Sequence, residues 1–207
     1  MRHLINITDL SVEEIRDLLD LADEMIADPR KYATSQQGRI LATLFFEPST
    51  RTRLSFESAM LSMGGSVLGF SSAESSSTAK GETLTDTIRT VGCYCDIIAM
   101  RHPKEGAPMA GSLKSSVPII NAGDGGHNHP TQTLTDLLTI RREKGRIDHM
   151  VVGLCGDLKF GRTVHSLIGA MSRYPGIRFV LISPPELRVP AYITRELSDR
   201  GIPFDEV

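Results

Sequence analysis

The sequence predicts an α/β protein of two three-layer α/β domains with parallel sheets, the second of which is truncated. Two observations support this prediction. Apolar runs with the length of buried strands alternate with segments of helical periodicity, the pattern of a parallel sheet covered by helices. The last apolar run lies near Phe204 and only three residues follow it. A doubly wound domain normally continues through a second half, so the second domain is expected to be incomplete.

The first part of the chain predicts one complete domain over residues 1–145. Ser11 and Glu14 have the spacing of a capping box at the start of a helix that runs to residue 26. Glycines follow the second expected helix, and a proline opens the last one. The expected strands are 40–46, 66–70, 96–100 and 117–121, and the helices that follow them are 49–63, 83–91 and 130–144.

The remaining residues, 146–207, predict the start of a second domain. The same alternation begins again here, with short apolar runs and intervening helical segments. The expected strands are 150–155, 179–182 and a third from about residue 201, and the expected helices are 162–171 and 192–197.

Composition excludes several classes of protein. The 207 residues are 40% hydrophobic and 23% charged, and the net charge of −2 gives no basic surface for nucleic acid or an anionic membrane. No apolar stretch approaches the roughly 20 residues of a membrane helix, and the first ten residues lack the core of a secretory signal. The three cysteines do not form a disulfide framework. A reducing, cytoplasmic location is therefore expected.

The most informative segment is Phe46-Glu47-Pro48-Ser49-Thr50-Arg51-Thr52-Arg53, where an expected strand passes into a helix. A helix N-terminus attracts anions, Ser49 is a good N-cap, and the Arg51 guanidinium suits phosphate or carboxylate. Arg53 lies four residues before Glu57 and is expected to pair with it along the helix. Capping alone would explain Ser49, but three hydroxyls and two arginines exceed what a cap needs.

Four further segments carry hydrogen-bond donors at strand or helix ends. Lys80 closes the serine-rich segment 71–80, which is either a lid over an anionic ligand or an ordinary solvated loop. Arg101 ends an expected strand, His129 and Gln132 lie at a helix entry, and Arg162 begins another helix. Donors without a competing carboxylate pair suit a polyanionic substrate and a developing oxyanion. No metal-ligand spacing and no nucleophilic triad is recognisable.

Together these segments resemble the aspartate/ornithine carbamoyltransferase family, over essentially the whole chain. The resemblance depends on 46–53, Lys80-Gly81-Glu82, Arg101-His102-Pro103, His129-Pro130-Thr131-Gln132 and 157–163. The ornithine branch typically has Cys where this chain has Thr131, so Thr131 and the Lys80 segment favour the aspartate branch.

The resemblance implies transfer of the carbamoyl group from carbamoyl phosphate to L-aspartate, in pyrimidine (UMP) biosynthesis. Of the two expected domains, residues 1–145 would then bind carbamoyl phosphate, and residues 146–207 would begin the aspartate-binding domain. The resemblance also implies which residues form the site. The phosphate would be held by Ser49, Thr50, Arg51 and Thr52, and the carbamoyl oxygen polarised by Thr52, Arg101 and His129. Gln132 would bind the carbamoyl amide, Lys80 and Arg162 the aspartate, and Ser76 and Lys80 would come from a neighbouring subunit.

The same resemblance implies a homotrimer of catalytic chains, with or without regulatory chains, and no metal or organic cofactor. Further aspartate-binding residues of the family lie beyond the part that matches, so we expect the 207-residue chain alone to be inactive. Two alternatives stay open. One is a transcarbamoylase for another amine such as ornithine, and the other is a non-catalytic anion-binding paralogue.

Overall fold

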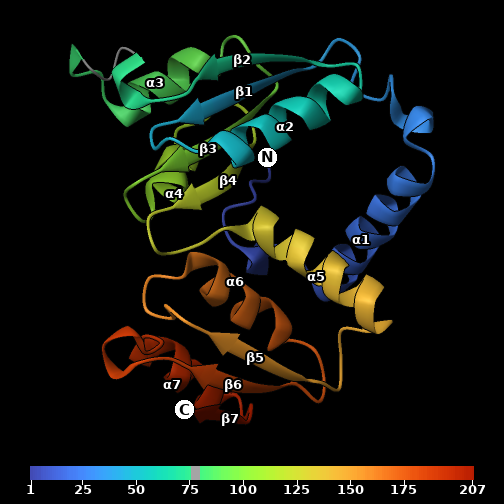
Figure 1. Ribbon diagram of the computed structural model, residues 1–207. Coiled ribbons are helices and arrows are strands. Elements are labelled where there is room, and N and C mark those ends of the chain that lie inside the picture. Colours follow the sequence, from blue (N-terminus) through green and yellow to red (C-terminus); the bar gives the residue numbers. More distant parts are fainter. Residues whose placement is uncertain (76–79) are drawn as a thin grey trace. The chain divides into compact units, whose positions relative to one another are not determined.

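A computed structural model of the protein describes residues 1–75 and 80–207, which form two compact units (Figure 1). Unit 1 comprises Met1–Ile5 and Asp20–Gly125, and unit 2 comprises Asn6–Leu19 and Gly126–Val207. This division passes through the first long helix, α1 (Val12–Ala27), because its buried residues Ile15 and Leu19 belong to the core of unit 2. The compact units therefore meet at residues 125 and 126 and not at residue 145. The domain boundary expected at residue 145 stays a prediction.

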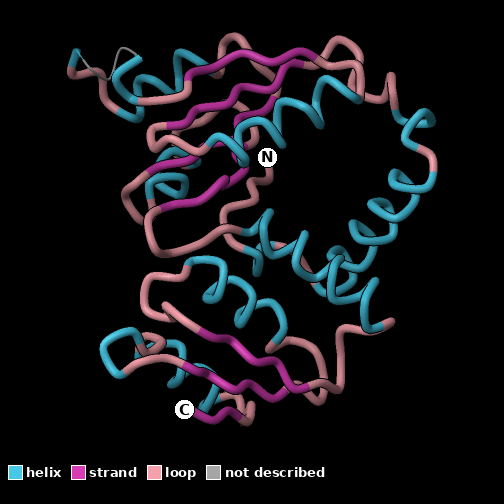
Figure 2. The backbone as a smooth tube through the Cα atoms, in the orientation of Figure 1, coloured by secondary structure: helices cyan, strands magenta, loops and turns pink. Residues whose placement is uncertain are grey.

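Unit 1 is built on a four-stranded parallel sheet with the order β2-β1-β3-β4 (Figure 2). Its strands are β1 (Ile40–Phe45), β2 (Ser66–Phe70), β3 (Ile97–His102) and β4 (Ile119–Asp124). Its helices are α2 (Thr50–Ser62), α3 (Leu84–Val91) and α4 (Ala107–Ser112), with short 3-10 segments at Pro29–Tyr32 and Ala73–Ser75.

Helices cover both faces of this sheet, which gives the three layers that the sequence predicts. Because side chains alternate along a strand, Ala42 and Leu44 of β1 face one way and Leu41 the other. The first face packs with Ile88 of α3 and Ala107 of α4. The second face packs with Met60 and Phe56 of α2, together with Ala99 of β3.

Unit 2 contains a second parallel sheet, with the order β5-β6-β7. Its elements are the 3-10 helix η1 (Ile7–Asp9), α5 (Pro130–Lys144), β5 (Val151–Cys155), α6 (Arg162–Met171), β6 (Arg178–Ile182), a 3-10 helix at Pro185–Leu187, α7 (Ala191–Asp199) and β7 (Phe204–Glu206). Leu154, Phe179 and Leu181 of the sheet share one core with residues of α5, α6 and α7. Val151 and Cys155, which point to the opposite face of β5, are exposed in the described structure.

Local sequence signals account for several element ends. Ser11 and Glu14 form the predicted capping box, in which each side chain accepts a hydrogen bond from the other's backbone N–H, at 3.1 and 2.8 Å. Gly145 ends α5 in the left-handed conformation, where a glycine is favoured. Among the described residues, no helix is long and apolar enough to cross a membrane.

Candidate active site

In unit 1, the segment 46–53 lies where the sequence predicts, between the end of β1 and the first turn of α2. Thr50, Arg51 and Thr52 form that first turn, whose backbone N–H groups have no partner within the helix. Thr50 and Arg51 are exposed, and Thr52 is partly buried. Within residues 1–75 and 80–207, the Arg51 guanidinium makes no hydrogen bond or ion pair. An accessible cation therefore lies beside the positive end of a helix.

Ser49 occupies the N-cap position of α2, but its hydroxyl makes no capping hydrogen bond. Only its backbone carbonyl is used, as acceptor from Arg53 N at 3.1 Å. The expectation that Ser49 caps with its side chain is wrong in this structure, and the hydroxyl stays available for a ligand. Arg53 pairs with Glu57 at 2.7 Å, as its spacing predicts, and Glu57 also accepts from the buried Thr43 hydroxyl at 2.9 Å. Arg53 is thus a structural residue.

Arg101 is placed beside this segment by the register of the sheet. Phe45, the last residue of β1, pairs with Arg101 near the end of β3, and Phe46 N donates to the Arg101 carbonyl at 2.9 Å. The Arg101 side chain is only 9% exposed, and its Nη2 lies 2.6 Å from Glu47 Oε1. Its Nε is buried and has no partner among the described residues. Arg101 is therefore a buried cation that donates to the Glu47 carboxylate and, at 3.5 Å, to the Ala122 carbonyl, and its Nε donor is left unused among the described residues.

In unit 2, His129 is the N-cap of α5. Its Nδ1 accepts from Gln132 N at 3.4 Å, and the Thr131 hydroxyl lies 3.4 Å from the same nitrogen. The backbone N of His129 donates to Ser166 Oγ of α6 at 2.9 Å, which fixes the start of α5 against α6. When Nδ1 accepts a hydrogen bond, the ring proton of a neutral imidazole lies on Nε2. His129 can then offer a neutral N–H donor to a carbonyl oxygen.

Gln132 lies one turn into α5, three residues after His129 as the sequence predicts, and is oriented by a carboxylate. Its Nε2 donates to Asp136 Oδ1 at 2.9 Å, and both side chains are partly buried. Burial raises the pKa of the Asp136 carboxyl above its ordinary value, and the hydrogen bond from Gln132 opposes that rise. The oxygen of the Gln132 amide has no partner in the described parts of the chain.

For the remaining predicted site residues, the structure gives only their position in the fold or their exposure. Arg162 is the first residue of α6 and is partly buried. Lys80 is exposed. Ser76 lies outside the described residues. The structure thus groups Ser49, Thr50, Arg51, Thr52 and Arg101 in unit 1, and His129, Gln132 and Arg162 in unit 2.

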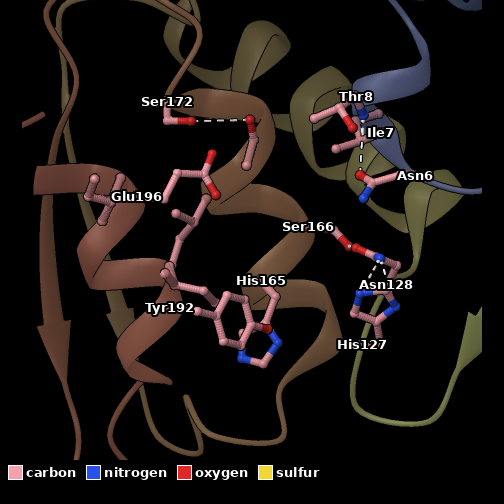
Figure 3. A pocket seen from close by; sticks show the side chains of 14 residues that line it. Asn6, Ile7, Thr8, His127, Asn128, His165, Ser166, Ser172, Tyr192 and Glu196 are labelled. Carbon is pink, nitrogen blue, oxygen red and sulfur yellow. Dashed lines mark hydrogen bonds between the residues drawn. The ribbon is translucent and has the colours of Figure 1, made fainter. Parts of the chain in front are cut away.

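A cavity of 120 Å³ within unit 2 contains none of the predicted site residues (Figure 3). Asn128 and Ser166 line it, and Ser166 Oγ donates to Asn128 Oδ1 at 3.3 Å. On another side, the rings of His165 and Tyr192 meet edge to face with centroids 6.4 Å apart. The cavity therefore lies next to the network that supports His129.

Sequence reasoning missed two acidic partners. Glu47 stands in the quoted motif, but only the sheet register shows that it pairs with Arg101. Asp136 follows Gln132 by four residues, and this helical spacing could have indicated the contact. Within residues 1–75 and 80–207, no group of three or more His, Cys, Asp or Glu residues could hold a metal ion.

Comparison with known families identifies the first two-thirds of the chain. Residues 2–142 match the family described as aspartate/ornithine carbamoyltransferase, carbamoyl-P binding domain. The chain belongs to the aspartate/ornithine carbamoyltransferase family. Among its curated relatives, it is 67% identical over its whole length to the aspartate carbamoyltransferase catalytic subunit of Lachnoclostridium phytofermentans, of which it covers 68%. It is 63% identical to that of Clostridium acetobutylicum, over 97% of this chain and 65% of the relative.

Solved structures of this family have the same fold. The catalytic subunit of M. jannaschii aspartate transcarbamoylase is 51% identical and superimposes with a TM-score of 0.91, over all of this chain and 68% of that one. Aspartate transcarbamoylase from Trypanosoma cruzi, in complex with carbamoyl phosphate and aspartate, is 40% identical with a TM-score of 0.92, over all of this chain and 70% of that one. The chain thus spans about two-thirds of the length of these relatives.

Proposed function

We propose that this chain is the part of an aspartate carbamoyltransferase catalytic subunit that binds carbamoyl phosphate and begins the aspartate site. The product would be N-carbamoyl-L-aspartate, with release of phosphate, in pyrimidine biosynthesis. The 67% identity to a catalytic subunit of that name, over the whole chain, carries this proposal. Free cysteines at 93, 95 and 155 agree with a cytoplasmic location.

In the proposed reaction, the residues of unit 1 bind the charged end of the substrate. The phosphate would be held by the first turn of α2 and by the side chains of Ser49, Thr50, Arg51 and Thr52, where charge accumulates as the phosphate leaves. Arg101 would donate to the carbamoyl oxygen. Its pair with Glu47, at 2.6 Å, means that a ligand must compete with a carboxylate for this guanidinium.

The residues of unit 2 would act on the uncharged carbamoyl group. The aspartate amine attacks the carbonyl carbon, a C–N bond forms, and the bond from that carbon to the phosphate oxygen breaks. His129, with its proton on Nε2, would stabilise negative charge on the carbonyl oxygen together with Thr52. Gln132 would accept a hydrogen bond from the carbamoyl NH₂, and Arg162 and Lys80 would bind aspartate carboxylates.

The test is a carbamoyl-transfer assay with a protein that extends this chain to the length of its relatives. Carbamoyl phosphate is supplied with either L-aspartate or L-ornithine, and the carbamoylated product is measured. We expect turnover with aspartate and at least a hundredfold less with ornithine. Efficient use of ornithine would overturn the choice of substrate, and turnover with neither amine would favour a non-catalytic anion-binding protein.

We further propose that Ser76 and Lys80 complete the site of a neighbouring subunit in a homotrimer. Arg51→Ala and Lys80→Ala variants, each nearly inactive, are mixed under conditions of subunit exchange. An interface that is head-to-tail rebuilds a site with an intact Arg51 from one chain and an intact Lys80 from the next. Activity should then rise well above either parent. Proven exchange without recovered activity would place Lys80 in its own subunit's site or outside any site.

A further inference from the structure

The first two turns of α5 contain a pair of hydrogen-bonded side chains, Gln132 and Asp136. The family resemblance implies a role for Gln132 but none for Asp136. Gln132 Nε2 donates to Asp136 Oδ1 at 2.9 Å, across one turn of the helix. In the described structure this is the only side-chain hydrogen bond that either residue makes. Among the described residues Asp136 has no cation beside it, and burial makes its charged form costly. A carboxylate in this position is therefore poorly explained by stability alone.

The chemistry of the pair fixes which way the Gln132 amide points. The oxygen and nitrogen ends of an amide have nearly the same shape, so its hydrogen-bond partners decide its orientation. An ionised carboxylate has only acceptors. Asp136 therefore holds the NH₂ end of Gln132 toward itself and directs the oxygen end away from itself.

We propose that Asp136 is a positioning residue that presents the Gln132 oxygen to the ligand, and that the site thereby selects an acyl phosphate with an N–H donor on its acyl carbon. This inference rests on the proposed function, in which Gln132 binds the carbamoyl amide. Carbamoyl phosphate and acetyl phosphate carry the same phosphate group and differ by an NH₂ in place of a CH₃. Opposite a methyl group the Gln132 oxygen loses its hydrogen bond, which penalises acetyl phosphate.

The test uses Asp136→Asn in a protein of the relatives' length. Asparagine keeps the size of the side chain but offers both a donor and an acceptor, so Gln132 can adopt either orientation. The kcat/KM values for carbamoyl phosphate and acetyl phosphate are measured with saturating aspartate, and the Kd of each is measured without aspartate. We expect the preference for carbamoyl phosphate to fall about tenfold, through its KM and Kd rather than kcat. Acetyl phosphate should change less than about twofold.

A second variant separates this role from a general effect on folding. Gln132→Ala should lower the preference by itself, and adding Asp136→Asn to it should change the preference no further. An equal loss for both acyl phosphates, or an Asp136→Asn effect that persists without Gln132, would overturn the inference. A parent protein with no aspartate turnover would instead contradict the proposed function, while the two Kd values would still test the role of Asp136.

Discussion

The residues that we propose to bind the ligand have different surroundings in the two units. In unit 1 they are cations, of which Arg51 is exposed without a partner among the described residues and Arg101 is paired with Glu47 at 2.6 Å. In unit 2 His129 and Gln132 are each oriented by a hydrogen bond within α5, which the His129 ring accepts and the Gln132 amide donates. A charged ligand reaches its partners through strong and long-range attraction, whereas a neutral carbonyl or amide needs donors and acceptors that already point correctly.

The largest effect should come from the exposed cation of unit 1. Arg51→Ala would remove the charge-assisted contact that we propose between Arg51 and the departing phosphate, which should cost about 3 kcal/mol or more, or over about a hundredfold in kcat/KM. The fold should persist, since Arg51 has no side-chain partner in the described structure. Steady-state kinetics and thermal unfolding measure both.

Arg53→Ala is the matched control on the same helix. It breaks the pair with Glu57, whose side chain is 17% exposed, and should lower stability by about 1–2 kcal/mol. Turnover should stay within a few-fold of the parent. Near-normal activity of Arg51→Ala, or a large loss in Arg53→Ala, would mean that the two roles are assigned to the wrong arginines.

Arg51 and Arg53 also show which features of the structure can be predicted from the sequence. Local signals place the strand, the helix and the Arg53–Glu57 pair, because each depends on residues close in the chain. The Arg101–Glu47 pair depends on strand register, and the assignment of α5 to unit 2 depends on where Leu137 packs. Such contacts join distant segments and leave no periodic signal. The short helix α4 was not predicted either, since its six residues include a proline and a glycine.

His129 tests whether orientation is what matters in unit 2. His129→Asn keeps an N-cap acceptor for α5 but loses the Nε2 donor, so kcat/KM should fall about a hundredfold with little loss of stability. His129→Ala loses the cap as well and should be less stable by about 1 kcal/mol. Equal activity of His129→Asn and the parent would show that the Nε2 donor is not used.

Glu47→Gln tests whether the ion pair with Glu47 limits the binding of a ligand to Arg101. The change leaves Arg101, 9% exposed, without its carboxylate and should lower stability by roughly 1–3 kcal/mol. Carbamoyl phosphate should then raise the melting temperature more in the variant than in the parent, because its carbonyl oxygen no longer competes with Glu47 for Arg101. An equal shift by carbamoyl phosphate in both proteins would argue that Arg101 does not contact this ligand.

The smallest effect concerns the stability of unit 2. Burial raises the pKa of Asp136 in the folded protein above 3.8, so the folded state binds this proton more tightly than the unfolded state. The associated stability is present below pH 3.8 and is lost as the pH rises through the raised pKa. At neutral pH the charged form therefore destabilises the fold.

Asp136→Asn removes that charge and should raise the stability at pH 7 by less than about 1 kcal/mol, or at most about 2–4 °C in melting temperature. The gain should shrink as the pH is lowered through the raised pKa of Asp136, because the parent carboxyl then becomes protonated. Thermal unfolding of parent and variant across this range measures it. A variant that is less stable than the parent, by the same amount at every pH, would show that the hydrogen bond from Gln132 to Asp136 outweighs the cost of burying the charge. A more stable variant with a weaker preference for carbamoyl phosphate would identify Asp136 as a residue kept for substrate selection at a cost in stability.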